Sequence, residues 1–356
     1  MISMLPGPTS VPESVMRSML DSGIYHRSDE FHEIFDEIQV NLRGLLKTKR
    51  SVYVLTSSGT GGIEAIVTNI LKPTDKALVV VNGYFSEGLA DLIEAFGIHA
   101  IRLDLKWNAG IVLDLVEQAL KREKQIRAVA VAYVETSTGS RADLEELADL
   151  CARFDAFLVV DGESAIAGED LCFDDWNVGA CVGGTQKCLC SPPGLSLVAI
   201  SEEGWDAITS KGHSGFYFDL QRYSECSERH ETPFTPALPL FFALRESLRL
   251  IGKEGLEARI KRHRECAHLL RDGLAGMNLK PYVPLDYCSN VCTAVDISGT
   301  RTSASQIVKK VLSCGVSIAA GLGPLKEQVI RIGTMGTVTT EDVSFTLAAL
   351  RKVIEE

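Results

Sequence analysis

The chain has 356 residues, of which 46% are hydrophobic and 23% charged, enough to bury the core of a large domain and of a smaller one. Its formal net charge of −11 argues against nucleic acid or an anionic membrane as the main partner. No run of about 18 apolar residues is present, and residues 1–10 lack the pattern of a secretory signal. We therefore expect a cytoplasmic protein.

Strands and helices alternate through the first 200 residues. Short apolar, β-branched runs predict strands over Val52–Thr56, Ala77–Val81, Ala128–Val134, Phe157–Asp161 and Leu195–Ile200. Between them, helical patterns cover Gly62–Leu71, Ser86–Phe96, Leu113–Arg122 and Leu144–Arg153. Such alternation predicts an α/β fold with a largely parallel sheet covered on both faces. Ligands of such sheets bind at the carboxyl ends of the strands.

The pattern changes near Pro236. A helical stretch over Pro239–Gly273, with a break near Gly252–Gly255, precedes shorter elements. These are a strand at Val291–Ile297, a helix at Ser303–Ser313, strands at Val316–Ala319 and Gln328–Gly333, and a helix at Thr340–Ile354. We expect an N-terminal arm over 1–20, a large domain over 21–250 and a small C-terminal α+β domain over 251–356.

The ten cysteines are scattered along the chain, and we expect most of them to be reduced thiols. Cys188 and Cys190 form one close pair, and Cys288 and Cys292 form another. Neither pair recurs with the spacing of a metal site, so no metal is expected.

A glycine-rich segment, Ser57-Ser-Gly-Thr-Gly-Gly62, lies directly between a predicted strand and a predicted helix. Backbone N–H groups at a helix N-terminus can hold an anion such as a phosphate. An ordinary glycine-rich turn would have the same composition, so this segment alone leaves both interpretations open.

Three further polar residues lie at positions where a ligand could bind. Asp161 ends an apolar strand, where ligands of parallel sheets bind, although a turn residue would look the same. Lys187 lies among small, turn-forming residues, which suits Schiff-base chemistry as well as a solvated loop. Arg331 interrupts the apolar run Val329–Gly333, where it suits either a carboxylate ligand or a structural salt bridge.

The order of these features favours one cofactor. A phosphate needs the glycine-rich segment, a pyridine nitrogen needs a carboxylate to stay protonated, and an aldehyde needs an amine. A substrate carboxylate needs an arginine. Pyridoxal 5'-phosphate with an amino-acid substrate requires all four of these groups.

The chain resembles the class V pyridoxal-phosphate aminotransferases of fold type I, in the alanine–glyoxylate and serine–pyruvate group. The resemblance covers nearly the whole chain. It rests on the segments Leu5–Thr9, His26–Phe31, Ser58–Gly61, Asn82–Phe85, Glu135–Gly139, Val160–Asp161, Thr185–Lys187, Pro192–Gly194 and Arg331–Gly336.

The resemblance implies a role for each matching residue. Lys187 would bind the cofactor through a Schiff base and carry the proton, and Asp161 would pair with the pyridine nitrogen. Ser58, Gly59, Thr60 and Gln186 would hold the phosphate. Ser137 would lie near the phenolic oxygen, Phe85 would stack on the ring, and Arg331 would bind the substrate's carboxylate. Thr232 would reach the phosphate of the partner subunit in a homodimer with shared active sites.

Three residues depart from the group's pattern. Phe85 replaces a common tryptophan, Thr60 replaces a frequent histidine, and Arg229 stands where a phosphate-binding tyrosine is usual. Aromatic stacking and a hydroxyl donor both survive these changes. Arg229 could hold phosphate or point away from it.

The resemblance implies a ping-pong transaminase that moves an amino group from a small amino acid, of the alanine or serine type, to glyoxylate or pyruvate. Relatives that act on 2-aminoethylphosphonate with pyruvate, or on ureidoglycine with glyoxylate, are the alternatives. A cysteine desulfurase is a further alternative, with Cys314 as its candidate nucleophile. Gln186 argues against it, because desulfurases usually carry a histidine before the lysine.

Overall fold

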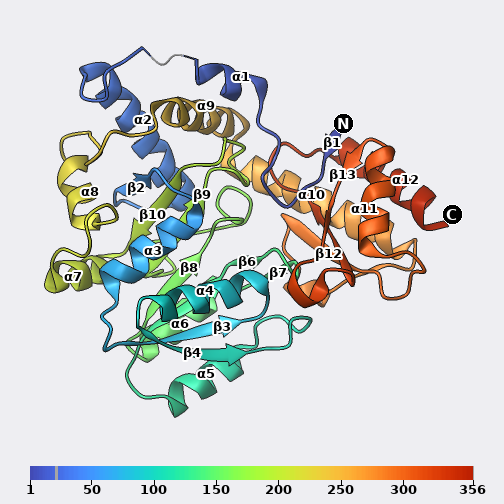
Figure 1. The fold of residues 1–356 in the computed structure, drawn as a ribbon, viewed down its shortest axis with the longest axis horizontal. Helices are drawn as coiled ribbons and strands as arrows, with labels where there is room; N and C mark the ends of the chain where they lie inside the picture. Colours follow the sequence, from blue (N-terminus) through green and yellow to red (C-terminus); the bar gives the residue numbers. More distant parts are fainter. Residues whose placement is uncertain (21–22, 356) are drawn as a thin grey trace.

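The computed structural model describes residues 1–20 and 23–355. A seven-stranded sheet forms its centre (Figure 1). Its strands, in spatial order, are β2 (Val52–Leu55), β10 (Ser196–Ile200), β9 (Ala180–Gly184), β8 (Phe157–Asp161), β5 (Ile126–Ala132), β3 (Lys76–Val81) and β4 (His99–Asp104). Strands β9, β8, β5, β3 and β4 pair in parallel, whereas β10 runs antiparallel to β9 and β2. The predicted, mostly parallel sheet is therefore confirmed.

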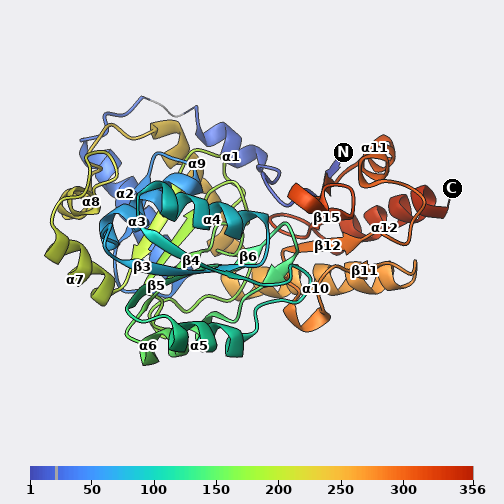
Figure 2. The ribbon, with the colours of Figure 1, turned by 60° about the horizontal axis from the view of Figure 1, so that its bottom comes forward.

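Helices cover both faces of this sheet (Figure 2). One core contains side chains of α2 (Asp29–Leu46), α5 (Leu113–Arg122), α6 (Leu144–Arg153) and α9 (Leu238–Glu254). The core on the other face contains side chains of α3 (Gly59–Ile70), α4 (Tyr84–Ala95), α7 (Glu202–Lys211) and α8 (Leu220–Ser227). Because both faces are covered, the central strands are apolar almost throughout instead of alternating with polar residues.

The sequence between the strands specifies where the helices begin. The Ser28 hydroxyl accepts a hydrogen bond from the Phe31 backbone N–H at the start of α2, and Asp143 caps α6 in the same way through the Glu146 N–H. The long helical stretch after Pro236 is broken at Gly255, as predicted, where α9 ends and α10 begins.

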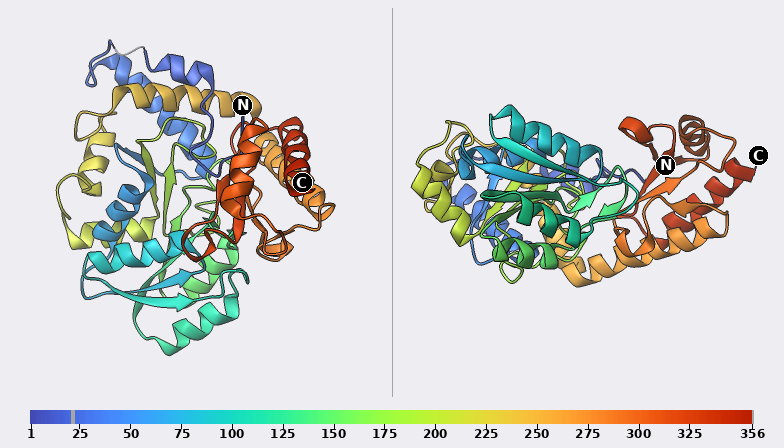
Figure 3. Two further views of the ribbon diagram at one scale, coloured as in Figure 1. Left: turned by 45° about the vertical axis from the view of Figure 1, so that its right-hand side comes forward. Right: turned by 90° about the horizontal axis from the view of Figure 1, so that it is seen from below.

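A second α+β unit follows (Figure 1, orange and red). Its four-stranded sheet contains β11 (Lys280–Pro281), β12 (Cys292–Asp296), β15 (Val329–Gly333) and β14 (Ala319–Ala320). Helices α10 (Leu256–Ala275), α11 (Ala304–Ser313) and α12 (Thr340–Glu355) pack with this sheet around a third core, and α10 runs along one side of it (Figure 3).

The N-terminal segment belongs to both units. Strand β1 (Ile2–Ser3) pairs in parallel with β13 (Val316–Ser317) of the second unit. The chain then passes over the large unit, where the Thr9 backbone N–H donates to the Gln186 carbonyl, and continues into α1 (Glu13–Ser18). Two short strands, β6 (Val134–Glu135) and β7 (Ser140–Arg141), form a separate hairpin at the junction of the units.

The strands and helices predicted in the first 200 residues are present, with ends that differ by up to three residues. Strand β4 was not predicted, because it lies at the sheet edge and its side chains are half-buried or exposed, so it lacks a long apolar run. The division at residue 250 stays a prediction, and its limits at residues 21 and 356 fall outside the described residues. Within the described ranges, no helix is both long and apolar enough to cross a membrane.

Candidate active site

A cavity of about 500 Å³ opens at the carboxyl edge of the large sheet. Segments that follow five different strands meet there, together with the N-terminal segment. The lining includes Gly7, Pro8, Ser58, Thr60, Phe85, Thr136, Asp161, Glu163, Gln186 and Lys187. Parallel sheets bind their ligands at this edge, because the loops after neighbouring strands converge there.

The N-terminus of α3 forms one wall of the cavity. Ser58 is the N-cap residue, and its side chain makes no capping hydrogen bond, so its hydroxyl is free for a ligand. The first backbone N–H groups of a helix have no partner within the helix, and the helix dipole favours an anion there. No acidic residue lies in the first turn of α3. The predicted anion site therefore lies in the cavity.

Lys187 follows β9 and lies under the N-terminal segment. Its Nζ donates to the Pro6 carbonyl at 3.0 Å, and its own carbonyl accepts from the Thr9 hydroxyl at 2.8 Å. Gly7 has a φ of +105°, and a Cβ there would lie 2.4 Å from Lys187 Cδ. A glycine is required at this position both by the backbone conformation and by the nearness of the lysine.

Asp161 is the last residue of β8, as predicted, and its Oδ1 accepts from the Glu163 backbone N–H at 3.0 Å. Burial raises the pKa of Asp161 to about 7, the nearby Glu163 carboxyl adds to the effect, and the charge of Lys187 opposes it. A cation placed against Asp161 would therefore stabilise its ionised form.

Glu163 also lines this cavity, although the sequence did not indicate it as a site residue. Its Oε2 accepts from Gln186 Nε2 at 3.0 Å. Its Oε1 lies so close to Gly59 that a Cβ added there would be 1.6 Å away from it. Burial raises the pKa of Glu163, while Lys187 and the Gln186 hydrogen bond lower it. The sequence shows that Glu163 lies two residues after the strand-end Asp161. That position does not indicate where the Glu163 side chain points.

The segment after β5 contributes Thr136 to the lining, and not the expected Ser137. The buried Ser137 hydroxyl donates to Glu135 Oε1 at 2.6 Å and accepts from the Tyr84 N–H at 3.0 Å. It thereby fixes the start of α4. Phe85, in the first turn of α4, lines the cavity with 38% of its surface exposed, as a stacking residue requires.

Arg331 and Thr232 lie outside the cavity lining of this chain. Arg331 is buried in β15, where its Nε donates to the Ala320 carbonyl at 2.8 Å, and burial lowers its pKa. Burial raises the pKa of the Cys292 thiol, and the charges of Arg331 and Lys187 oppose this rise. The Thr232 hydroxyl donates to the Phe234 carbonyl at 2.7 Å.

Arg229, the other candidate for phosphate binding, lies just beyond α8, and its side chain points back to the last turn of that helix. Its Nη1 donates to the Glu225 carbonyl at 3.0 Å, and its Nη2 lies 3.3 Å from the Cys226 sulfur.

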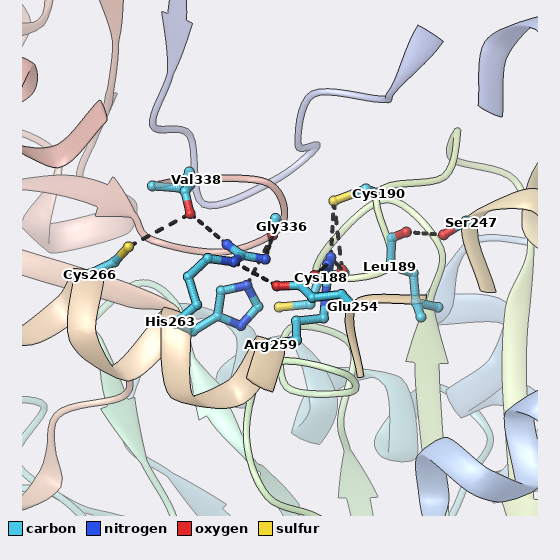
Figure 4. Close-up of polar contacts among 11 residues, drawn as sticks. Cys188, Leu189, Cys190, Ser247, Glu254, Arg259, His263, Cys266, Gly336 and Val338 are labelled. Atoms are coloured by element: carbon cyan, nitrogen blue, oxygen red, sulfur yellow. Dashed lines mark hydrogen bonds and ion pairs between the residues drawn. The ribbon is translucent and has the colours of Figure 1, made fainter. Parts of the chain in front are cut away.

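The loop that follows Lys187 is anchored from α9 and α10 (Figure 4). Arg259, buried in α10, donates through Nη2 to the Cys188 carbonyl at 2.5 Å and through Nη1 to Glu254 at 2.7 Å. The Ser247 hydroxyl donates to the Leu189 carbonyl. The backbone that holds Lys187 is thus tied to the junction between the two units.

Comparison with known proteins gives consistent results. Residues 6–344 match the family model of the class V aminotransferases. An uncharacterised aminotransferase of Methanocaldococcus jannaschii is 33% identical, over 99% of this chain and 92% of its own length. The (S)-ureidoglycine–glyoxylate transaminase of Bacillus subtilis is 32% identical, over 99% and 90%. The crystal structure of an alanine–glyoxylate aminotransferase from Nostoc sp. is 29% identical and superposes with a TM-score of 0.94, over 99% of this chain and 94% of that one.

The cavity fits pyridoxal phosphate in most of its parts. It joins a helix N-terminus for the phosphate, a strand-end carboxyl for the ring nitrogen, an amine for the aldehyde and an aromatic face for the ring. Gln186 Oε1 is buried and has no hydrogen-bond partner among the described residues, which leaves one polar atom for a ligand. The Glu163 carboxyl, which lies over Gly59, is the one group that conflicts with a phosphate.

Proposed function

Because the chain belongs to the class V aminotransferase family, we propose that it is a pyridoxal-phosphate-dependent transaminase that transfers the amino group of a small amino acid to glyoxylate or pyruvate. The main support for this proposal is that Lys187, Asp161 and the N-terminus of α3 line the same cavity. The relatives with named glyoxylate substrates support the choice of acceptor.

When bound, the cofactor supplies an aldehyde that exchanges amines and a ring that takes up electrons. Asp161 pairs with the protonated ring nitrogen, because a cationic partner stabilises the ionised form of its partly buried carboxyl. Ser58, Gly59, Thr60 and Gln186 hold the phosphate, and Phe85 covers the ring. These roles account for four of the segments that line the cavity.

Lys187 Nζ moves the proton. It removes the α-proton of the amino donor and returns a proton during the transfer. The N-terminal segment limits where Nζ can go, since Pro6 accepts its hydrogen bond and Gly7 lies against its side chain. Arg331 binds the carboxylate of the substrate through guanidinium nitrogens other than Nε, which is engaged with Ala320.

The chain acts as a homodimer in the cytoplasm, with Thr232 reaching the partner's phosphate. Two observations support the dimer. Thr232 lies outside the cavity of its own chain, and large aromatic side chains are exposed, including Tyr25 at 62% and Phe216 at 66%. Light scattering should give twice the mass of one chain, and a monomeric mass for the active species would refute the dimer.

A panel of amino donors tested with glyoxylate and with pyruvate checks the function. Alanine or serine should be turned over, and Lys187→Ala should abolish turnover. Transamination by Lys187→Ala at a near-normal rate would refute the role of this lysine. Faster turnover of ureidoglycine than of alanine or serine would favour the alternative that the Bacillus subtilis relative supports.

A cysteine desulfurase is the less favoured alternative. Its candidate nucleophile, Cys314, follows α11 and packs against the core of the second unit. Alkylation of the Cys314 thiol should therefore leave the transaminase activity unchanged.

A further inference from the structure

We propose that the Glu163 carboxylate competes with the phosphate of the cofactor for the N-terminus of α3, so that ionisation of Glu163 weakens the binding of phosphorylated ligands. The inference rests on the proposed function, because it takes this cavity to be the cofactor site. It assigns to Glu163 a role in deciding which form of the cofactor the protein retains.

The position of the carboxyl carries the argument. Glu163 Oε1 lies over Gly59, 1.6 Å from where a Cβ would stand, and Oε2 is 3.0 Å from Gln186 Nε2. Gly59 and Gln186 are two of the groups proposed to hold the phosphate. The carboxylate therefore lies where phosphate oxygens would lie, and the absence of a side chain on Gly59 is what gives it room.

The N-terminus of α3 favours the Glu163 carboxylate for the same reason that it favours a phosphate. Anions are favoured at a helix N-terminus, and the first turn of α3 has no acidic residue of its own. A phosphate monoester brings a charge of about −1.5 to −2 at neutral pH into the same space. Glu163 must then turn away, and lose its bond to Gln186, or take up a proton. Either change reduces the affinity for the phosphate.

The other charged groups near Glu163 do not remove this conflict. Lys187 is the cation that faces it, and Lys187 is committed to the aldehyde in the proposed function. Asp161, two residues earlier, is a second acid, and the charge of Glu135 also reaches Asp161. Because burial already raises the pKa of Glu163, a fall in pH protonates it readily and relieves the competition.

Pyridoxal, which lacks the phosphate, separates this effect from the others. It presents the same ring nitrogen to Asp161 and the same aldehyde to Lys187. Titration of those two groups, and any effect that Glu163 has through them, therefore acts on both ligands alike, whereas direct competition by the Glu163 carboxylate acts on pyridoxal phosphate alone. The ratio of the two dissociation constants isolates the contribution of the phosphate.

The experiment measures the dissociation constants of pyridoxal phosphate and of pyridoxal by absorbance titration of the cofactor-free full chain, from mildly acidic to mildly alkaline pH. The variants are Glu163→Gln, which keeps the shape and removes the charge, and Glu163→Ala. Glu145→Gln, at an exposed position in the first turn of α6, makes the same charge change away from the cavity and serves as the control.

At alkaline pH, Glu163→Gln should bind pyridoxal phosphate about tenfold more tightly than the wild type, equivalent to ~1.4 kcal/mol, while pyridoxal binding changes by less than about twofold. The gain should shrink as pH falls. Ionisation of the phosphate itself is common to both proteins and cancels in their comparison. Glu145→Gln should behave as the wild type.

An unchanged or weaker preference of Glu163→Gln for pyridoxal phosphate over pyridoxal would overturn the inference and leave the proposed function intact. Failure of the wild type and of every variant to bind either ligand would instead refute the proposed function. Glu163→Ala gives an independent answer if the glutamine variant does not fold.

Discussion

Gly7 offers a sharp test of how the N-terminal segment controls Lys187. An alanine at this position meets two obstacles. Its φ of +105° disfavours any side chain, at a cost of about 1–2 kcal/mol. Its Cβ would also lie 2.4 Å from Cδ, 2.6 Å from Nζ and 2.8 Å from Cε of Lys187, all too short for non-bonded contacts.

The lysine chain is flexible, so it moves more readily than the backbone does. We therefore expect Gly7→Ala to lose only about 1–2 kcal/mol of stability but to displace Nζ by about 1 Å. Misplacing a catalytic group by that distance lowers the rate by about 10²-fold. The predicted result is a large loss of kcat/KM with a modest loss in the free energy of unfolding.

Steady-state transamination and denaturant unfolding of the same preparations measure the two effects. Gly44→Ala is the matched control, because Gly44 is exposed in α2 and a Cβ there meets no atom within 4 Å. It should gain about 0.5–1 kcal/mol of stability and keep its activity. Unaltered kcat/KM in Gly7→Ala would refute the idea that this glycine places the lysine.

Three other substitutions test separate parts of the account. Asp161→Asn should stabilise the cofactor-free protein at alkaline pH by up to about 4 kcal/mol, an upper bound from the interval between 3.8 and about 7, and this gain should vanish at acidic pH. The sign follows because a carboxyl with a raised pKa stabilises the fold when protonated and loses that contribution as pH rises. Melting curves across pH measure it, and a gain independent of pH would contradict it. Arg331→Ala should raise KM for α-amino acids, whereas unaltered steady-state kinetics would show that another cation binds the carboxylate. Arg259→Met should lower the free energy of unfolding by about 2–4 kcal/mol, because the Cys188 carbonyl and Glu254 lose a buried charged donor; denaturant titration would contradict this if the loss were under about 0.5 kcal/mol.

The large sheet could be predicted from the sequence because its strands are local signals. Strand β8, for example, contains the buried apolar run Phe157–Val160, and helix α6 begins at its own side-chain cap, Asp143. Strand β4 was missed because an edge strand needs no apolar run. Hydrophobic pattern therefore finds the interior of the sheet more easily than its edges.

Site residues could be predicted only where the residue type and its position in the predicted sheet both indicate a ligand-binding role. Asp161 and Lys187 line the cavity because the end of a strand in a parallel sheet determines where a side chain goes. The role of Ser137 near the phenolic oxygen stays a prediction, because its hydroxyl is bonded to Glu135 and to the Tyr84 N–H and nothing in the sequence shows this. The Glu163 side chain points toward the start of α3 because it packs against Gly59. This is a tertiary contact that no local sequence pattern predicts.

The roles of Arg331 and Thr232 stay predictions for a related reason. Each is bonded to a carbonyl within its own chain, and neither lines the cavity at the carboxyl edge of the large sheet. Their proposed functions depend on a bound substrate and on a second subunit, which a single sequence does not specify.

Lys187 is the residue that we expect to carry the cofactor. Reduction of the holoenzyme with borohydride fixes the cofactor to the amine that carries it, and peptide mass spectrometry then identifies that residue. We predict that the cofactor's mass is found on the peptide containing Lys187 and is absent in Lys187→Ala. Attachment to any other lysine, or no attachment in a protein that retains transaminase activity, would contradict the account.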